Sequence, residues 1–453
     1  MRAFARQMTE RVKAVAAAGA VAAFWLAVWI FAAALVAQPL ILPGPGAVVV
    51  ALLRLVCDAN TWAILVGSGA RILGGLALAA ACGGVLAGVS VRSCAFARLV
   101  APALSFVKAT PVACVVVLLL IWLGSARVSI AAVLLMALPG VYFSLVEGLA
   151  QADKPLEQMF RLHGVRGWRL FFAHTWHEVL PFVLSCARAV IGMSWKAGVA
   201  AELIGMATGT VGERIYQAKL LIETADLLAW TVLVVAASWA CERVLVWLLR
   251  ASGPAAWRAA VQAHGRAASA GAGVAAELAL AVGDRAPWAP ALDGLVLRVP
   301  AGGRTCVMGA SGVGKSTLLA LAAGECVPCS MVFQDVRLVE DVSALDNVLV
   351  CADARVDSSS AAALLRLLVP GVDVHARVAE LSGGQRRRVE IARALLCPGG
   401  AVILDEPFTG LDTAARDACA EVVLDLLDGR MLLLATHDAV DARALDILDI
   451  ITL

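Results

Sequence analysis

The stretch Gly309-Ala310-Ser311-Gly312-Val313-Gly314-Lys315-Ser316-Thr317 decides the fold of the C-terminal part of the chain. It fits the pattern G-x-x-x-x-G-K-[ST], follows an apolar strand-like run and precedes the helical run LLALAAG. A strand, a glycine-rich turn and a helix in this order predict a P-loop α/β domain. In such a turn, backbone N–H groups surround phosphate oxygens at a helix N-terminus. We therefore expect a phosphate site formed by Gly309, Ser311, Gly312, Gly314, Lys315, Ser316 and Thr317.

The chemistry of that site depends on a few polar side chains. Lys315 supplies a positive charge for the β- and γ-phosphates of a nucleotide, and Ser316 supplies a hydroxyl for Mg²⁺. The apolar run AVIL (401–404) ends in Asp405 and Glu406. Asp405 is placed to hold Mg²⁺ through water, and Glu406 is placed to polarise an attacking water as a general base.

A second anion site is predicted at Leu381-Ser382-Gly383-Gly384-Gln385, which opens the helical run RRRVEIARALL. Small residues at the positive end of a helix favour a bound anion. A single nucleotide already has one phosphate site in this chain. The second site therefore implies that two chains share each nucleotide, with contacts from Ser382, Gly383, Gly384 and Gln385.

The first 250 residues have a different composition. Hydrophobic residues make up 61% of the whole chain and charged residues 16%, and the mean hydropathy is +0.85. Soluble domains are nearer about 45–50% apolar and about 25% charged. A wholly soluble or disordered protein is excluded. Stretches long enough to cross a bilayer as helices lie near 17–42, 62–90, 99–124, 128–149, 178–207 and 226–249.

The charges predict the orientation and exclude one class of partner. Lys and Arg gather before the first span, between alternate spans and after residue 250, which places the N-terminus and the α/β domain in the cytoplasm. The first span is too long for a signal-peptide core, so we expect it to be retained. A net charge of +2 provides no basic surface for nucleic acid.

A few polar residues fall in or beside the apolar half. Charged side chains in a span either line a solute path or are paired and snorkelling, and both interpretations remain open for Arg71, Lys108, Arg188, Lys196 and Glu202. One specific expectation is a pair between Lys196 and Glu202. His163, His174 and His177 are interpreted as solvated or packed side chains, and the twelve cysteines as reduced thiols.

With these motifs in their order, the sequence resembles the ATP-binding cassette (ABC) transporters over essentially its whole length. The resemblance implies ATP as the nucleotide. It also implies a Gln334 that contacts Mg²⁺ or its water in the so-called Q-loop, and an Asp412 in the D-loop. His437 then lies near the γ-phosphate, and Trp288 stacks on adenine.

The apolar half is similar to permeases of the nitrate/sulfonate/taurine importer group, on LPGPGAVV (42–49), KATPVACVVVLLLIWLG (108–124) and AELIGMATGTVG (201–212). Residues 158–172 stand where that family has a cytoplasmic loop whose short helix docks into the ATPase and transmits its closure. Gln158-Met159-Phe160 replaces the family's Glu-Ala-Ala. The segment between Lys315 and Gln334 is short, which implies a reduced β subdomain on the adenine side.

We therefore expect an all-α polytopic membrane domain of about six transmembrane helices (1–250), a linker (251–275) and an α/β ABC ATPase domain (276–453). The resemblance implies an ATP-driven importer of a small anion or heterocycle in a bacterial inner membrane. It would work as a homodimer with an extracytoplasmic substrate-binding protein. Two alternatives are an export half-transporter, because membrane domain followed by ATPase is the usual exporter order, and a non-transporting ATPase that regulates a membrane partner.

Overall fold

A computed structural model describes residues 2–263, 277–282, 289, 292–326 and 328–453. The chain divides into two compact units. The helical unit comprises residues 1–150 and 179–250, and the α/β unit comprises residues 151–178 and 251–453. Residues 151–178 thus belong with the C-terminal part of the chain, although apolar helices flank them in the sequence.

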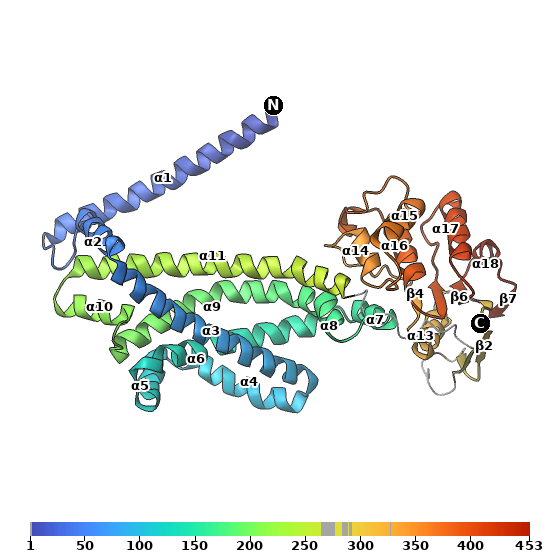
Figure 1. Ribbon diagram of the computed structural model, residues 1–453, viewed down its shortest axis with the longest axis horizontal. Helices are drawn as coiled ribbons and strands as arrows, with labels where there is room; N and C mark the ends of the chain where they lie inside the picture. The colour runs from blue at the N-terminus through green and yellow to red at the C-terminus, as the bar shows by residue number, and fades with distance from the viewer. Residues whose placement is uncertain (1, 264–276, 283–288, 290–291, 327) are drawn as a thin grey trace. The chain divides into compact units, whose positions relative to one another are not determined.

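The helical unit is built from mostly apolar helices of 10 to 39 residues joined by short turns (Figure 1). Their bounds, including ends that extend into residues of the other unit, are α1 (Arg2–Val36), α2 (Pro45–Cys57), α3 (Ala59–Arg92), α4 (Cys94–Ala109), α5 (Val112–Leu123), α6 (Ser125–Gln151), α9 (Trp176–Gly205), α10 (Val211–Leu220) and α11 (Thr224–Gln262).

Among the described residues, five helices are long and apolar enough to cross a membrane, and a sixth span results if α4 and α5 count as one. These two helices are bent by 103° at their junction. The stretch predicted near 99–124 therefore consists of two helices with a sharp bend between them. Pro111 explains the break, because proline has no N–H to donate and disfavours helical geometry at the preceding Thr110.

Glycines allow the helices of this unit to approach closely. A Cβ on Gly75 of α3 would lie 2.8 Å from the Cβ of Val133 on α6. One on Gly198 of α9 would lie 2.5 Å from Ile72 Cγ1 on α3. Small residues at such crossings are typical of helices that pack without a hydrophobic drive in lipid.

A buried carboxylate of the helical unit takes part in an ion pair. The side chain of Glu202 is fully buried, and it accepts hydrogen bonds from Ser68 Oγ at 2.8 Å and Arg71 Nε at 3.2 Å. The expected pair between Lys196 and Glu202 is wrong, since Glu202 bonds across to α3 and Lys196 is exposed. Six residues along a helix place two side chains on different faces, which explains the difference.

The α/β unit contains the 151–178 segment and two sheets. Its elements are α7 (Lys154–Leu162), α8 (Gly167–Leu170), a π-helical turn (Phe171–Thr175), β1 (Glu277–Ala281), β2 (Val296–Pro300), β3 (Arg304–Met308), α13 (Lys315–Glu325), β4 (Ser330–Val332), α14 (Ala344–Leu349), α15 (Ser358–Leu368), a 3-10 turn (Val378–Glu380), α16 (Gly383–Leu396), β5 (Ala401–Asp405), α17 (Thr413–Asp425), β6 (Met431–Thr436), α18 (Ala439–Ala444) and β7 (Asp449–Thr452).

The main sheet has five parallel strands in the order β4-β5-β6-β3-β7. A separate antiparallel pair is formed by β1 and β2. The carboxyl ends of parallel strands meet at one edge of a sheet, where α/β proteins bind ligands. The chain segments that follow β3, β4, β5 and β6 carry the P-loop, Gln334, Glu406 and His437, so the sheet brings these motifs to one edge.

The 151–178 segment packs into the core of the α/β unit. Met159 and Phe160 of α7 are 0% and 1% exposed, and they belong to the same apolar cluster as Val307, Leu319 and Ile403. Burial of a phenylalanine side chain contributes about 1.5–3 kcal/mol. The backbone N–H of Cys329 donates to Leu162 O at 3.0 Å, and this bond joins the segment to the chain just before β4.

Candidate functional site

The P-loop adopts the backbone geometry that a phosphate cradle needs. Gly312 and Gly314 have φ angles of +85° and +113°, which side-chain-bearing residues rarely adopt. The Nζ atom of Lys315 donates to the carbonyl oxygens of Gly309 and Ala310 at 2.8 and 3.1 Å. Lys315 thus lies across the inside of the loop, at the first residue of α13.

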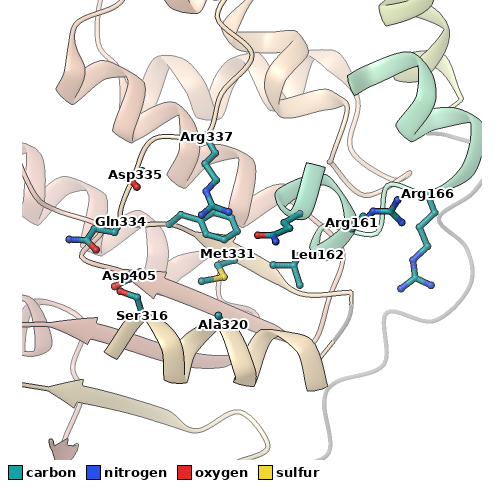
Figure 2. Close-up of a pocket in the computed structure, with 12 residues that line it drawn as sticks. Arg161, Leu162, Arg166, Ser316, Ala320, Met331, Gln334, Asp335, Arg337 and Asp405 are labelled. Carbon is teal, nitrogen blue, oxygen red and sulfur yellow. The ribbon is translucent and has the colours of Figure 1, made fainter. Parts of the chain in front are cut away.

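A cavity of about 740 Å³ opens beside this loop (Figure 2). Ser316, Gln334 and Asp405 line one part of it, and Gln158, Arg161 and Arg166 of the 151–178 segment line another. The three residues expected to serve Mg²⁺ are therefore brought together, although they come from α13, the segment after β4, and the end of β5.

Asp405 has features that fit a cation. Its Oδ1 atom is buried and has no hydrogen-bond partner among the described residues. Burial raises the pKa of this carboxyl, and a hydrogen bond from Ser316 opposes the rise. An unpartnered carboxylate oxygen next to a hydroxyl and an amide oxygen is the hard oxygen donor set that Mg²⁺ prefers.

Glu406 and His437 lie at neighbouring strand ends. Nδ1 of His437 lies 3.2 Å from Oε1 of Glu406. Glu406 has a φ of +46°, and its N–H donates to Ala435 O at 2.9 Å. This left-handed backbone, uncommon for a residue with a side chain, is held by the neighbouring β6 strand. The imidazole is exposed while the Glu406 side chain is largely covered.

The Ser382–Gln385 stretch starts α16. Ser382 Oγ accepts from Gln385 N at 3.3 Å, and Gln385 Oε1 accepts from Ser382 N at 2.8 Å, which together form a capping box. Ser382 and Gly383 are exposed. Among the described residues that line the 740 Å³ cavity, none belongs to 382–385.

The remaining predicted residues have simpler surroundings. Asp412 is exposed and caps α17 by accepting from Ala415 N at 2.7 Å. Ser311 and Ser316 are exposed, and Thr317 is half-buried at the start of α13. Trp288, expected to stack on adenine, lies outside the described residues, as do residues 264–275 of the expected linker.

One group of residues at this site was missed by sequence reasoning. Glu390 of α16 is fully buried, and it pairs with Arg387 at 3.0 Å and with Arg393 at 3.3 Å. In the sequence these charges belong to RRRVEIAR, which is typical of a solvated helix face. The available signal was their spacing of three, which places all three side chains on one face of a helix.

Two segments of the chain match models of known protein families. Residues 292–409 match the family model of the ABC transporter, and residues 80–258 match that of the binding-protein-dependent transport system inner membrane component. Each half of the chain therefore matches a transport family independently.

Similar curated proteins match about a third of the chain. The lipoprotein-releasing system ATP-binding protein LolD of Xanthomonas axonopodis pv. citri (strain 306) is 35% identical, over 35% of this chain and 78% of the relative. The taurine import ATP-binding protein TauB of Chromobacterium violaceum is 37% identical, over 34% of this chain and 68% of the relative. The aliphatic sulfonates import ATP-binding protein SsuB of Escherichia coli (strain K12) is 36% identical, over 34% of this chain and 68% of the relative.

A solved structure, the dimeric post-hydrolysis state of an ATP-binding cassette bound to ADP and Pi, is 25% identical over 36% of this chain and 86% of its own, with a TM-score of 0.33. The family assignment rests on the match of residues 292–409 to the ABC transporter model, the 35% identity to a LolD protein of which 78% is covered, and the match of residues 80–258 to a transport-system membrane component. The chain therefore belongs to the ABC transporter family, as an ATP-hydrolysing transport protein in which a membrane permease domain and an ATP-binding domain are fused.

Proposed function

We propose that this protein is an ATP-driven importer, which takes a small solute from a separate extracytoplasmic binding protein. The observation that carries the proposal is the match of residues 80–258 to the membrane component of binding-protein-dependent transport systems. This match lies in the same chain as the ATP-binding domain, so one gene product would supply both the path and the energy.

The proposed ATP site uses residues that share one edge of the sheet. Lys315 and the P-loop amides would hold the phosphates, as cations and helix N-termini do in this fold class. Mg²⁺, held by Ser316, Asp405 and Gln334, would neutralise charge on the phosphates. Glu406 would accept a proton from the attacking water, and His437 would keep that carboxylate in place near the γ-phosphate.

A homodimer is proposed because the site is incomplete in one chain. The exposed Ser382–Gly383 start of α16 and the exposed Asp412 lie outside the lining of the cavity that holds Ser316 and Asp405. In a two-fold dimer each surface meets its counterpart reciprocally. The Ser382–Gln385 amides of one chain would then bind the phosphate held by the other chain's P-loop.

The proposed coupling element is the 151–178 segment. Its α7 helix is buried against the ATP-binding core, and Gln158 and Arg161 line the same cavity as Gln334. Closure of two ATP-binding domains on nucleotide would therefore move this segment directly. Since α6 and α9 flank it in the chain, the movement would be delivered to two helices of the permease.

We also propose the division into a permease (1–250), a linker (251–275) and an ATP-binding domain (276–453), with the 151–178 segment of the permease docked on the ATP-binding domain. The basic residues at the span ends support an N-terminus and ATP-binding domain in the cytoplasm. A bacterial inner membrane would be the location of such a transporter.

The proposed solute is a small anion such as a sulfonate or taurine, supported by the import proteins among the relatives. A lipoprotein-releasing relative of similar identity indicates that the ATP-binding half alone does not choose the solute. Export and regulation of a membrane partner are therefore the two outcomes that an experiment has to separate from import.

Reconstituted vesicles test the proposal. Full-length protein in liposomes with ATP inside should accumulate labelled taurine or an alkanesulfonate only when a binding protein loaded with that solute is added outside. Loss of uptake in Glu406→Gln is the control for ATP dependence. Outward solute movement without a binding protein would favour export, and ATP hydrolysis with no movement of any solute would favour a regulator.

A further inference from the structure

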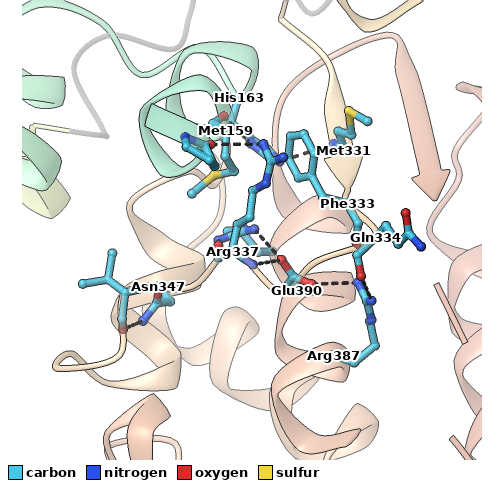
Figure 3. Close-up of polar contacts among 12 residues, drawn as sticks. Met159, His163, Met331, Phe333, Gln334, Arg337, Asn347, Arg387 and Glu390 are labelled. Atoms are coloured by element: carbon cyan, nitrogen blue, oxygen red, sulfur yellow. Dashed lines mark hydrogen bonds and ion pairs between the residues drawn. The ribbon is translucent and has the colours of Figure 1, made fainter. Parts of the chain in front are cut away.

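The short segment 333–337, which follows β4 and contains Gln334, is held by side chains of α16 (Figure 3). Strand pairing between β4 and β5 ends at Val332, so the next carbonyl groups have no partner in the sheet. Arg387 supplies one: Nη1 donates to Phe333 O and Nη2 donates to Gln334 O. One guanidinium thus binds two consecutive carbonyls.

The other end of the segment is held by the same helix. The backbone N–H of Arg337 donates to Glu390 Oε1 at 2.6 Å, and Nη1 of Arg393 donates to Arg337 O at 2.5 Å. Both ends of the five-residue segment are therefore bonded to α16, whose first turn is the Ser382–Gln385 stretch.

Glu390 organises these arginines. It is fully buried and accepts from Nη1 of Arg387 and from Nη2 of Arg393. Burial raises the pKa of this carboxyl, and the two arginines and the Arg337 N–H oppose the rise. A buried carboxylate with several donors fixes their orientation, because losing one contact leaves a charge unpaired.

The side chain of Gln334 contrasts with its backbone. It is exposed and lines the cavity with Ser316 and Asp405, and no described residue hydrogen-bonds its amide. Its reach toward a metal-bound nucleotide is therefore set by where its main chain is held.

The same segment also contacts the 151–178 segment. Nη1 of Arg337 donates to Pro155 O at 3.1 Å, and its guanidinium lies 3.7 Å from the centre of the Phe333 ring. Movement of α16 would therefore reach both the Gln334 amide and the start of α7 through one short piece of chain.

We propose that Arg387, oriented by Glu390, is a positioning residue for ATP hydrolysis. It fixes the Gln334 main chain to α16. Binding of the other chain's nucleotide at the N-terminus of α16 would therefore set the position of the Gln334 side-chain amide in the ATP site. This rests on the proposed role of Gln334. The alternative is that Arg387 and Glu390 only stabilise the fold.

A double-mutant cycle on the full-length protein separates these two possibilities. Arg387→Lys keeps a positive charge for Glu390 but loses the planar fork that binds two carbonyls. We expect kcat to fall about tenfold, with KM for ATP within about twofold. Because Arg387 acts through Gln334, the Arg387→Lys/Gln334→Ala protein should have the kcat of Gln334→Ala within about twofold.

Arg388→Lys is the matched control, since this neighbouring arginine also donates to carbonyls, those of Gly384 and Leu368, but not to the 333–337 segment. Its kcat should stay within about twofold of the parent. If Arg387→Lys proves unstable by thermal melting, Glu390→Gln completes the same cycle, with the same expected non-additivity.

Multiplicative effects of Arg387→Lys and Gln334→Ala would overturn the positioning role, and so would an unchanged kcat in Arg387→Lys. An unchanged kcat in Gln334→Ala would instead contradict the role of Gln334 in the proposed function. The two failures are therefore told apart by the single variants.

Discussion

His437 Nδ1 lies 3.2 Å from Glu406 Oε1, at the ends of two neighbouring parallel strands. The contact joins the candidate general base to the exposed imidazole that we propose lies near the γ-phosphate. It follows from strand order: β5 pairs with β6, with Asp405 opposite Ala435, so the residues just beyond them emerge side by side.

Glu406→Gln should abolish most hydrolysis and keep ATP binding. The amide has the size of the carboxylate but cannot accept the proton of water, and general bases contribute about 10²–10⁴-fold. We expect kcat to fall at least about 100-fold, measured as phosphate release, with unchanged affinity for a fluorescent ATP analogue. Glu421→Gln, an exposed glutamate on α17, is the control. A Glu406→Gln protein with parental kcat would refute the assignment of the base.

Asp405→Asn should remove the Mg²⁺-dependent part of ATP binding. The buried carboxylate, whose Oδ1 atom has no hydrogen-bond partner among the described residues, would lose the charge that attracts the cation. Saturating ATP at about 100 times Kd stabilises a protein by about 2.7 kcal/mol, and we expect a higher melting temperature with MgATP than with ATP and EDTA in the parent only. An equal Mg²⁺ effect in the variant would show that the cation is held elsewhere.

His163 should make the α/β unit sensitive to acid. It is buried, its Nε2 accepts from Met331 N at 3.3 Å, and Nδ1 contacts Met159 O at 2.8 Å. Burial lowers its pKa from 6.5 to about 3, with Arg393 adding to the effect. As the pH falls, His163 is protonated in the unfolded chain before it is protonated in the folded chain. Its contribution to the free energy of unfolding is therefore fully present above pH 6.5 and is lost as the pH drops toward 3, with a loss of about 2 kcal/mol at pH 5.

Melting curves of the full-length protein at pH 7.5 and pH 5 measure this effect. His163→Gln should be less stable at pH 7.5 but should lose less on going to pH 5. His375→Gln, at an exposed histidine, should keep the parental pH dependence. Identical pH dependence in His163→Gln and the parent would contradict the buried neutral imidazole.

Arg71→Met should destabilise the helical unit more than Glu202→Gln does. Arg71→Met leaves the fully buried Glu202 carboxylate without its cation, and breaking such a pair costs about 3–5 kcal/mol. Glu202→Gln leaves Arg71 without its carboxylate, which costs less because the Arg71 side chain is partly exposed. Thermal melting in detergent checks the order, with Lys196→Met as the control. A larger loss in Lys196→Met than in Arg71→Met would restore the pairing expected from the sequence.

The fold class and the residues that gather at the candidate ATP site were predictable because their signals are local. Apolar stretches of spanning length predict membrane helices, and the P-loop pattern needs only eight consecutive residues. The α4–α5 bend was missed because both helices are apolar, so hydropathy continues across Pro111 although the chain turns.

The charge networks could not be predicted because their partners are far apart in sequence. Arg71 and Glu202 are 131 residues apart, and Arg387 binds the Gln334 carbonyl 53 residues away. Spacing along one helix shows which side chains share a face, but only tertiary packing decides which distant element that face meets. The burial of α7 in the α/β unit also depends on contacts between elements that are distant in sequence, although a family resemblance indicated a docking loop there.

The central claim is that two copies of this chain share each ATP, with the P-loop from one and the Ser382–Gln385 stretch from the other. Co-expression of Lys315→Ala with Ser382→Arg chains tests it most directly, through the ATPase rate of purified full-length dimers. Each variant alone should be inactive. A head-to-tail mixed dimer has one intact site, so random mixing should restore about one quarter of the parental rate. No recovery, in mixed dimers that are shown to form, would contradict the shared site.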